Sequence, residues 1–455
     1  MGAPWRPSWR GLFPAALVVS AAALVLFFRG GASASPVSRA LTVLALVEHG
    51  TLQADQWFDL TIDQTIVNGH IYSGKPPFPS FLVLPFYWAW RLLHPGAYAA
   101  NDINVVVYLG DIVAAALPFG AFVLLLERRA ERGMGAQEAV WVALLAAFGT
   151  PLLSYGSTYF GHMLSGALFV FAYEAATRAT ADCEPYRCAM VAGLLAGLGV
   201  LTDLTLWIGV VALATFLATR PRGLRLAAYY AVGGLPCALA FGAYNACITG
   251  SPFDWVYVHV TSTLYSPTPI KLDLHTIAVA RDLLISEYRG LFFYAPALLV
   301  LAPLAYAHTE PRARRWLLIA FTGAHFVFVA SYWVWDGGWC IGPRHLTPMM
   351  MILLYEGVGA LAISTASWRV TFVALASVGL AVNLVAVTTN PWIDVSRHPF
   401  RDDYWPAFLR GQMTPDSVFR DLGLGWGRRT AYAWCALFVV TATLLAWQAK
   451  RARAR

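Results

Sequence analysis

The chain has 455 residues, of which 58% are hydrophobic and only 13% are charged, and its formal net charge is +7. Its mean hydropathy of +0.57 is typical of an integral membrane protein and excludes an ordinary soluble enzyme. The basic residues are scattered over separate loops rather than gathered on one surface, so the positive charge does not indicate nucleic-acid binding.

Apolar runs long enough to cross the hydrocarbon core of a bilayer recur along the chain. We therefore predict an all-α multi-span membrane protein in one domain, residues 1–455. The predicted twelve spans are 11–28, 103–126, 137–153, 157–176, 187–202, 204–219, 224–246, 291–307, 316–335, 346–365, 370–388 and 430–448.

Charge placement predicts the orientation of these spans. If the spans alternate, all basic clusters fall on one side, which the positive-inside rule makes cytoplasmic. These clusters are Arg6 with Arg10, residues 128–132, 220–225 and 312–315, Arg369, and residues 450–455. Both termini are then cytoplasmic in a multi-pass protein of the inner or plasma membrane. Segments 29–102, 247–290 and 389–429 and the turn 336–345 become extracytoplasmic.

The first span also fits a secretory signal peptide, because its apolar run follows Arg10 and is followed by Ala32, Ser33 and Ala34, an A-x-A pattern. The run is about 18 residues, longer than the usual core of a signal peptide. Since a functional loop and further spans follow it, we expect the first span to be kept as an anchor.

Two helices are predicted in the first extracytoplasmic loop, 29–102. Residues 38–49 have the apolar pattern of an amphipathic helix. Residues 78–93 are apolar and aromatic but too short to span after the Pro76-Pro77 pair. A crossing there would also move every later basic cluster outside, so we predict an interfacial helix that lies on the membrane.

Polar side chains gather between these two helices. Asp55, Asp59 and Asp63 are four residues apart and share one face if the segment is helical. A carboxylate beside an acceptor hydroxyl can act as general base, and three together could hold Mg²⁺. His70 and Tyr72 are nearby candidates for substrate binding. The alternative is that all of these are solvated loop residues.

Lys75 lies at the membrane end of this loop, just before the Pro76-Pro77 pair, and is one of only three lysines in the chain. A lysine ammonium suits a lipid-linked phosphate or pyrophosphate as a compact point charge. The alternative is that Lys75 reaches toward ordinary lipid headgroups.

A second cluster is the turn WDGGWCIGPRH, residues 335–345. Its glycines allow backbone to approach a ligand closely, and Arg344 offers a planar fork for a phosphate. Trp339 supplies a flat face for a sugar or prenyl chain. The alternative is an interfacial aromatic belt whose arginine anchors headgroups.

Several further residues are weaker candidates because each could simply cap a helix or pair locally. They are Tyr159, His162, Asp203, Glu287, Tyr288 and Arg289. His325, within a span, is more typical of a buried histidine with a satisfied hydrogen bond. The six cysteines do not form a disulfide framework, although Cys247 and Cys340 could pair. No P-loop occurs, which argues against an ATP-driven pump.

Taken together, these motifs resemble a known family. RALTVLALVEHGTL, NGHIYSGKPP and LVLPFY resemble the first outer loop of bacterial membrane glycosyltransferases of the C-type fold (GT-C). These enzymes use polyprenyl-phosphate sugars and are related to protein O-mannosyltransferases and to the aminoarabinose transferase of lipid A. GGWCIGPRHLTP resembles the GGWS-x-GPRYL-x-P element of one branch, and NPWIDVSRHPFRDDYWPAFLRG is also similar to that branch.

The resemblance implies roles for two basic residues. In the family, a lysine just before a Pro pair contacts the donor phosphate, which matches Lys75. An arginine on a later outer loop is expected to assist, which matches Arg344. Relatives also place an acid directly after the first span, whereas this chain has SPVSR at residues 35–39. The base must therefore come from elsewhere, with Asp63 preferred over Asp59 and Asp55.

The predicted function is an inverting-type transfer of a hexose or pentose from a polyprenyl-phosphate carrier to an extracytoplasmic glycan, lipid or protein acceptor. Expected partners are the lipid-linked donor and membrane lipids, without nucleic acid; no cofactor is certain and a divalent metal stays open. One alternative is a transporter or flippase, which predicts charges near the middle of spans and repeated halves. A surface-polysaccharide polymerase or ligase is another.

Overall fold

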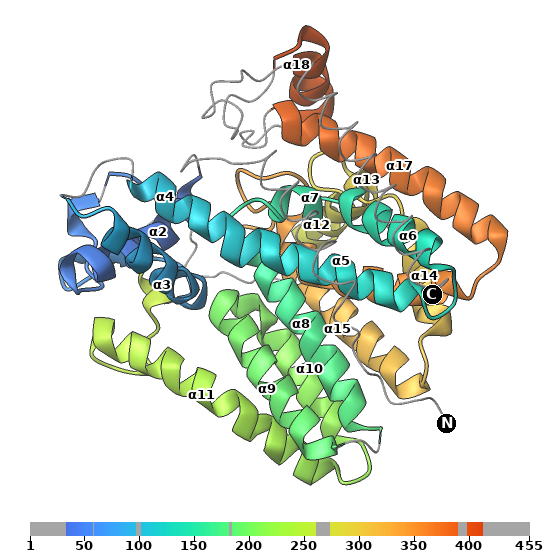
Figure 1. The fold of residues 1–455 in the computed structure, drawn as a ribbon, viewed down its shortest axis with the longest axis horizontal. Helices are drawn as coiled ribbons and strands as arrows, with labels where there is room; N and C mark the ends of the chain where they lie inside the picture. Colours follow the sequence, from blue (N-terminus) through green and yellow to red (C-terminus); the bar gives the residue numbers. More distant parts are fainter. Residues whose placement is uncertain are drawn as a thin grey trace.

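The computed structural model describes residues 33–57, 59–96, 102–181, 184–260, 274–389 and 398–412. The described part is helical apart from one small hairpin and connecting turns (Figure 1). The predicted spans 11–28 and 430–448 lie outside these residues. Six described helices are long and apolar enough to cross a membrane, and three shorter apolar helices accompany them.

The first loop folds as a compact unit at one side of the molecule (Figure 1). Helices α2 (Ala34–His49), α3 (Phe78–Leu93) and α4 (Asp102–Gly110) share one apolar core. The helix predicted at 38–49 is confirmed and begins earlier. Its expected one-sided burial is wrong, because residues 35–45 are all buried. The α3 helix exposes large apolar side chains such as Trp88 and Leu92, a face suited to the predicted membrane interface.

A β-hairpin connects α2 to α3, and the sequence analysis did not predict it. A short 3₁₀ turn, η2 (Asp55–Trp57), precedes strands β1 (Gln64–Val67) and β2 (His70–Ser73), which pair antiparallel. Asn68 and Gly69 have φ values of 51° and 82°. A two-residue type I′ hairpin turn requires positive φ at both of its central residues, and Asn-Gly is its strongest sequence signal.

The remaining elements follow in chain order. They are a π-helical stretch η3 (Asp111–Ala116), α5 (Leu117–Ala130), α6 (Ala136–Phe148), α7 (Leu152–Tyr155), α8 (His162–Ala179), α9 (Pro185–Thr202), η4 (Leu204–Leu206), α10 (Trp207–Ala218), α11 (Gly223–Thr249), η5 (Val256–His259), α12 (Leu274–Ile285), α13 (Leu291–Tyr294), α14 (Leu298–His308), α15 (Arg312–Ala330), η6 (Arg344–Leu346), α16 (Thr347–Ala362), α17 (Ala366–Thr389), η7 (Phe400–Tyr404) and α18 (Trp405–Arg410).

Each predicted span within the described residues overlaps one to three of these elements, whereas only the six long helices have the length to cross a membrane. The spans at 137–153 and 291–307 are interrupted, between α6 and α7 and between α13 and α14. Pro151 and Pro296 lie at these breaks. A proline interrupts a helix because it lacks the backbone N–H that a continuing helix needs. The α16 helix lies in the interior, since nearly all of its residues are buried.

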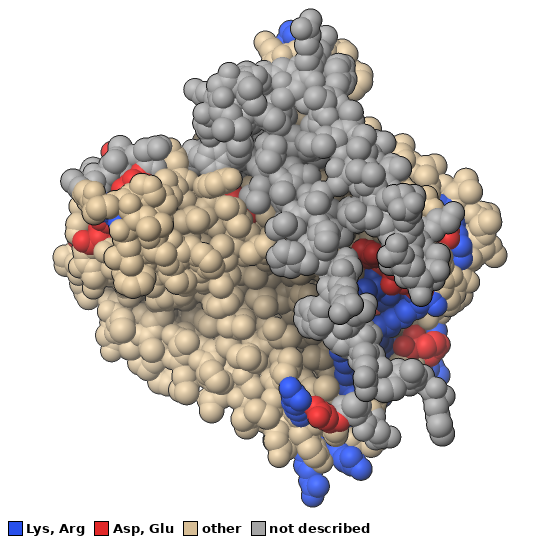
Figure 2. Space-filling model, viewed as in Figure 1, with Lys and Arg blue, Asp and Glu red and all other residues tan. Residues whose placement is uncertain are grey.

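Helices α9 and α11 pack against each other through glycines. A Cβ atom on Gly193 would lie 1.9 Å from the Tyr230 carbonyl oxygen, and one on Gly233 would lie 1.9 Å from the Met190 carbonyl oxygen. Small residues that let backbones meet are typical of helix pairs in membranes, where apolar burial alone gives little driving force. Figure 2 shows a broad face without Lys, Arg, Asp or Glu over α9–α11, with charged groups gathered at one end.

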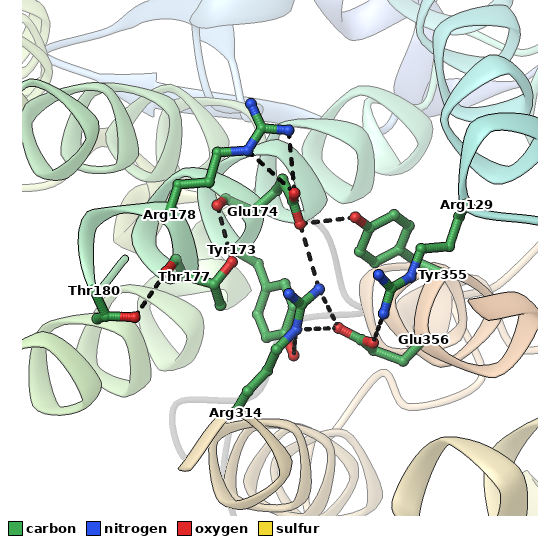
Figure 3. A network of polar contacts seen from close by, with 9 residues as sticks. All are labelled: Arg129, Tyr173, Glu174, Thr177, Arg178, Thr180, Arg314, Tyr355 and Glu356. Carbon is green, nitrogen blue, oxygen red and sulfur yellow. Dashed lines mark hydrogen bonds and ion pairs between the residues drawn. The ribbon is translucent and has the colours of Figure 1, made fainter. Parts of the chain in front are cut away.

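A buried ionic network joins four helices at the end predicted to be cytoplasmic (Figure 3). The Arg314 guanidinium of α15 binds Glu356 of α16 at 2.6 Å and Glu174 of α8 at 3.3 Å. Arg129 of α5 binds the other Glu356 oxygen at 2.7 Å, and the Tyr355 hydroxyl donates to Glu174 at 2.7 Å. The Glu356 side chain has no exposed surface, so its charge depends on these partners.

We expect Glu356→Ala to destabilise the protein strongly, because it leaves Arg314 and Arg129 buried without their shared carboxylate. Breaking a buried pair costs about 3–5 kcal/mol. Glu184→Ala is the matched control, since Glu184 pairs with Arg187 on the surface, where a pair is worth about 0–1 kcal/mol. Thermal unfolding in detergent measures both, and equal shifts for the two variants would contradict the structural role of the network.

Candidate functional site

Lys75 is held in place by the base of the β-hairpin. Its Nζ lies 2.9 Å from Asp63 Oδ2, and the two side chains are only 11% and 12% exposed. The Ser38 hydroxyl of α2 donates to the Asp63 carbonyl oxygen at 2.5 Å and lies 2.9 Å from the Ser73 hydroxyl. Because Asp63 precedes β1 and Ser73 ends β2, α2 anchors both arms of the hairpin and fixes the ammonium group beside them.

The three predicted aspartates do not share a helical face, and that expectation is wrong. Asp55 lies on the exposed side of the hairpin, where it accepts from the Ile71 amide at 2.6 Å and binds His70 at 2.8 Å. Its slight burial opposes ionisation, but these two hydrogen bonds outweigh it and hold the Asp55 pKa below its usual value. Asp59 is exposed. Of the three, only Asp63 pairs with Lys75.

Three further predicted substrate-binding residues, Tyr72, His70 and Trp339, make no contact with Lys75 that the described part of the structure shows. Tyr72 is buried in a small apolar cluster with Tyr244, Ile248 and Val256. His70 pairs with Asp55 near the hairpin turn, and Trp339 is half exposed. Their direct contact with a substrate stays a prediction.

Arg39 is a buried cation that the sequence analysis did not select. Only 4% of it is exposed, and Nη1 donates to the Ser35 hydroxyl at 2.6 Å. Burial lowers the Arg39 pKa, while the charges of Asp63 and Asp203 oppose that change. A Cβ atom on Gly161 would lie 3.1 Å from Arg39 Nη2, so the guanidinium packs beside the residue that precedes His162. A lone charge within an otherwise apolar, small-residue helix is the sequence signal that could have identified it.

The turn predicted from DGGWCIGPRH is organised around one guanidinium. Arg289 is 2% exposed. It donates to the carbonyl oxygens of Asp336 at 2.6 Å, Gly338 at 2.5 Å and Cys340 at 2.9 Å. These contacts use the fixed geometry of the arginine fork. The Cys340 thiol is buried and free, and Cys247 is also free, so the suggested disulfide between them is wrong.

Arg344 crosses this turn at Gly337. A Cβ atom on Gly337, whose φ is 73°, would lie 2.7 Å from Arg344 Nε, so only glycine fits at this position. The Arg344 guanidinium carbon lies 4.8 Å from the centre of the Phe160 ring, on its face. Arg344 Nε is buried and has no hydrogen-bond partner among the described residues.

His345 links the turn to the other charged groups. Its ring lies edge-on to the rings of His162 at 5.4 Å and Tyr332 at 5.8 Å. Both ring nitrogens are buried without a hydrogen-bond partner in the described part of the chain. Lys75 pairs with Asp63, which Ser38 of α2 contacts, and the next residue, Arg39, approaches Gly161 beside the Phe160 ring on which Arg344 lies. A chain of contacts thus links Lys75 to Arg344, and their joint contact with a substrate stays a prediction.

His162 and Asp203 form a hydrogen-bonded pair at the same end of the bundle. His162 Nδ1 lies 2.8 Å from Asp203 Oδ2, and Asp203 Oδ1 accepts from the Thr205 amide and hydroxyl at 3.1 and 2.8 Å. Burial alone would raise the Asp203 pKa, but the bond with His162 and the influence of His345 hold it well below its usual value. The carboxylate therefore stays ionised.

An apolar groove opens beside this site, between α10 and α15. Its cavity volume is about 820 Å³, and its walls include Trp207, Val211, Trp316, Gly323 and Phe328. The groove extends from Trp207 and Ser331, at the site end, to Arg220 and Ala313 at the other end. The stacked rings of Phe328 and Tyr332, and Tyr332 against His345, connect the groove to the charged site.

The described residues contain no group of three or more His, Cys, Asp or Glu arranged to hold a metal ion. The three aspartates suggested for Mg²⁺ do not converge, since Asp55 pairs with His70 and Asp63 with Lys75.

Comparison with solved structures identifies the fold. ArnT from Cupriavidus metallidurans bound to undecaprenyl phosphate matches with a TM-score of 0.54 at 17% identity, covering 96% of this chain and 76% of that one. The apo state of the same protein gives a TM-score of 0.53 at 15% identity, with the same coverage. No family model matches the chain, and no curated protein does. The GT-C fold expected from the sequence is confirmed.

We expect Arg289→Met to expose the Cys340 thiol, because the turn loses the donors that hold three of its carbonyl oxygens. Labelling of folded, detergent-solubilised protein with a maleimide, mapped by peptide mass spectrometry, measures this directly. Arg281→Met is the control, since Arg281 lies on the surface beside Asp282. A Cys340 thiol that stays unreactive in the Arg289 variant would show that other contacts hold the turn.

Proposed function

We propose that this protein is a membrane glycosyltransferase that moves a sugar from a polyprenyl-phosphate carrier to an extracytoplasmic acceptor. The observation that carries the proposal is a chain of contacts, through Asp63, α2 and Phe160, that links the three cations Lys75, Arg39 and Arg344 next to an apolar groove. A cationic site with an apolar channel matches a ligand that has a phosphate head and an isoprenoid tail.

The charges of the site fit a phosphate. Lys75, Arg39 and Arg344 supply three positive charges against two nearby carboxylates, Asp63 paired with Lys75 and Asp203 paired with His162, so the site keeps a net positive charge. The departing group in this transfer is a phosphate ester, so fixed cations that face it stabilise the charge that develops on it. Arg344 Nε, which has no protein partner among the described residues, is a donor that the phosphate would satisfy.

The groove between α10 and α15 provides room for the isoprenoid chain. Several of its side chains, among them Trp207, Trp316 and Val327, are about half exposed, as expected for a surface that faces lipid. The site end of the groove is connected to His345 by Tyr332, whose ring lies edge-on to the His345 ring. ArnT, which shares the fold, is described with bound undecaprenyl phosphate. That observation belongs to ArnT and supports the same ligand class here.

The transporter alternative is less well supported. A transport pathway predicts ionisable groups that line a route near the middle of the spans. The buried charges of Glu174, Arg314 and Glu356 instead neutralise one another in a closed network. The cations of the site gather at the other end of α8, where the first loop covers them.

We expect Lys75→Ala to weaken binding of undecaprenyl phosphate to the protein in nanodiscs and to reduce sugar transfer severely. Lys75→Arg should be intermediate, because the wider guanidinium fits a point-charge contact imperfectly. If Arg344 holds the same phosphate, Lys75→Ala and Arg344→Ala together should lose less than the sum of the two single losses. Arg187→Ala, on the exposed surface, is the control.

Native mass spectrometry measures lipid binding, and mass spectrometry of surface glycans in a deletion strain measures transfer. Unchanged lipid binding and transfer in the Lys75→Ala variant would contradict the proposed phosphate site. Strictly additive losses would place Lys75 and Arg344 at separate sites.

We expect Gly323→Phe to reduce binding of undecaprenyl phosphate by filling the groove. No atom lies within 4 Å of a Cβ built on Gly323, so the added ring projects into open space without strain on the packing. Val232→Phe is the matched control, because Val232 is exposed on the apolar face of α11, away from the groove. Equal lipid binding by the two variants would place the isoprenoid chain elsewhere.

A further inference from the structure

We infer that His162, held by Asp203, is the general base of this enzyme and that it acts on a hydroxyl group of the acceptor. The inference rests on the proposed function and names a catalytic group and a substrate class for it. It also accounts for the departure noted at residues 35–39, where the chain lacks the acid that its resemblance to GT-C enzymes predicts.

The geometry carries the assignment. The bond of 2.8 Å between Nδ1 and Asp203 Oδ2 places the ring proton on Nδ1, because an ionised carboxylate only accepts. Nε2 is then the basic nitrogen, and among the described residues it has no hydrogen-bond partner. Asp203 is itself fixed by two hydrogen bonds from Thr205. A base oriented by a third, buried group is the arrangement that activates hydroxyl nucleophiles.

His162 is also next to the groups proposed to bind the phosphate. Its ring lies 5.4 Å from the His345 ring and 6.2 Å from Phe160, on whose face Arg344 lies. The side chain is about one-tenth exposed, so a substrate group can reach it. Asp63, the base preferred from sequence, is instead bound to Lys75, which makes it a positioning residue for the ammonium group.

In the proposed reaction the sugar moves from the phosphate oxygen to the acceptor hydroxyl in one displacement. The acceptor oxygen attacks the anomeric carbon while Nε2 of His162 takes the hydroxyl proton. The bond between that carbon and the phosphate oxygen breaks, and its electron pair leaves on the polyprenyl phosphate beside Lys75 and Arg344. His162 later returns the proton to water.

The presence of this base specifies the acceptor. A phosphate acceptor is already ionised near neutral pH and has no proton that a base must remove during attack. A hydroxyl group must lose its proton as the new bond forms. The His162–Asp203 pair therefore favours a hydroxyl acceptor on a glycan, lipid or protein over a phosphate acceptor.

The test expresses full-chain variants in a deletion strain and measures the restored surface glycan in spheroplasts by mass spectrometry. We expect His162→Ala to lower transfer by roughly 10²–10⁴-fold, and added imidazole to restore part of it, which a purely structural histidine would not allow. His162→Gln should be equally inactive. The Asp203→Asn variant should lose less transfer activity than His162→Ala. The double variant should be no less active than His162→Ala alone.

Binding of undecaprenyl phosphate to the purified variants in nanodiscs separates this inference from the proposed function. We expect His162→Ala to bind the lipid like the wild type. His259→Ala is the matched control, because His259 forms a similar pair with Asp254 at 2.7 Å on the exposed surface, and its transfer should not change.

Wild-type transfer by both His162 variants would overturn the assignment, as would loss of transfer without imidazole rescue. An inactive Asp63→Asn variant beside an active His162→Ala would return the role of base to Asp63. Failure of the wild type to bind undecaprenyl phosphate would overturn the proposed function and, with it, this inference.

Discussion

One guanidinium holds the turn from which the charged site is built. Arg289 is bound by the carbonyl oxygens of Asp336, Gly338 and Cys340. A glycine-rich turn has many accessible conformations, and this contact selects one of them. In that conformation Arg344 crosses Gly337 and reaches the Phe160 ring. Arg289 thus helps to position Arg344 and His345, together with Tyr155, which donates to the Ile341 carbonyl oxygen, and His325, which bonds the His345 carbonyl oxygen.

The two polar clusters of the molecule lie near opposite ends of α8 and differ in how well they are satisfied. His162 begins the helix and Glu174 lies near its end, about 18 Å apart at 1.5 Å per residue. At the Glu174 end, carboxylates and guanidinium groups pair with one another, which makes a rigid structural joint. At the His162 end, Arg344 Nε and the nitrogens of His345 lack partners among the described residues. Unsatisfied buried groups are costly, and a polar ligand would supply what they lack.

The groove and the charged site complement each other. A ligand with only an anionic headgroup would need only the cations of the site. A ligand with only an apolar tail would need only the groove. Here Tyr332 contacts the groove through Phe328 and the site through His345. A ligand with both parts would bridge the two regions across the membrane interface.

The sequence by itself selected Lys75 and Arg344, whose contact with a substrate stays a prediction, and it determined that apolar helices recur along the chain and that helices form around 38–49 and 78–93. These are local signals, because bilayer thickness sets the length of an apolar run. The Asn-Gly pair at residues 68–69 could also have revealed the hairpin. Only the tertiary structure decided which aspartate meets Lys75 and that His162 meets Asp203, 41 residues away. A single polar residue at a helix end has the same local pattern whether it caps the helix or joins a site, and only packing distinguishes the two.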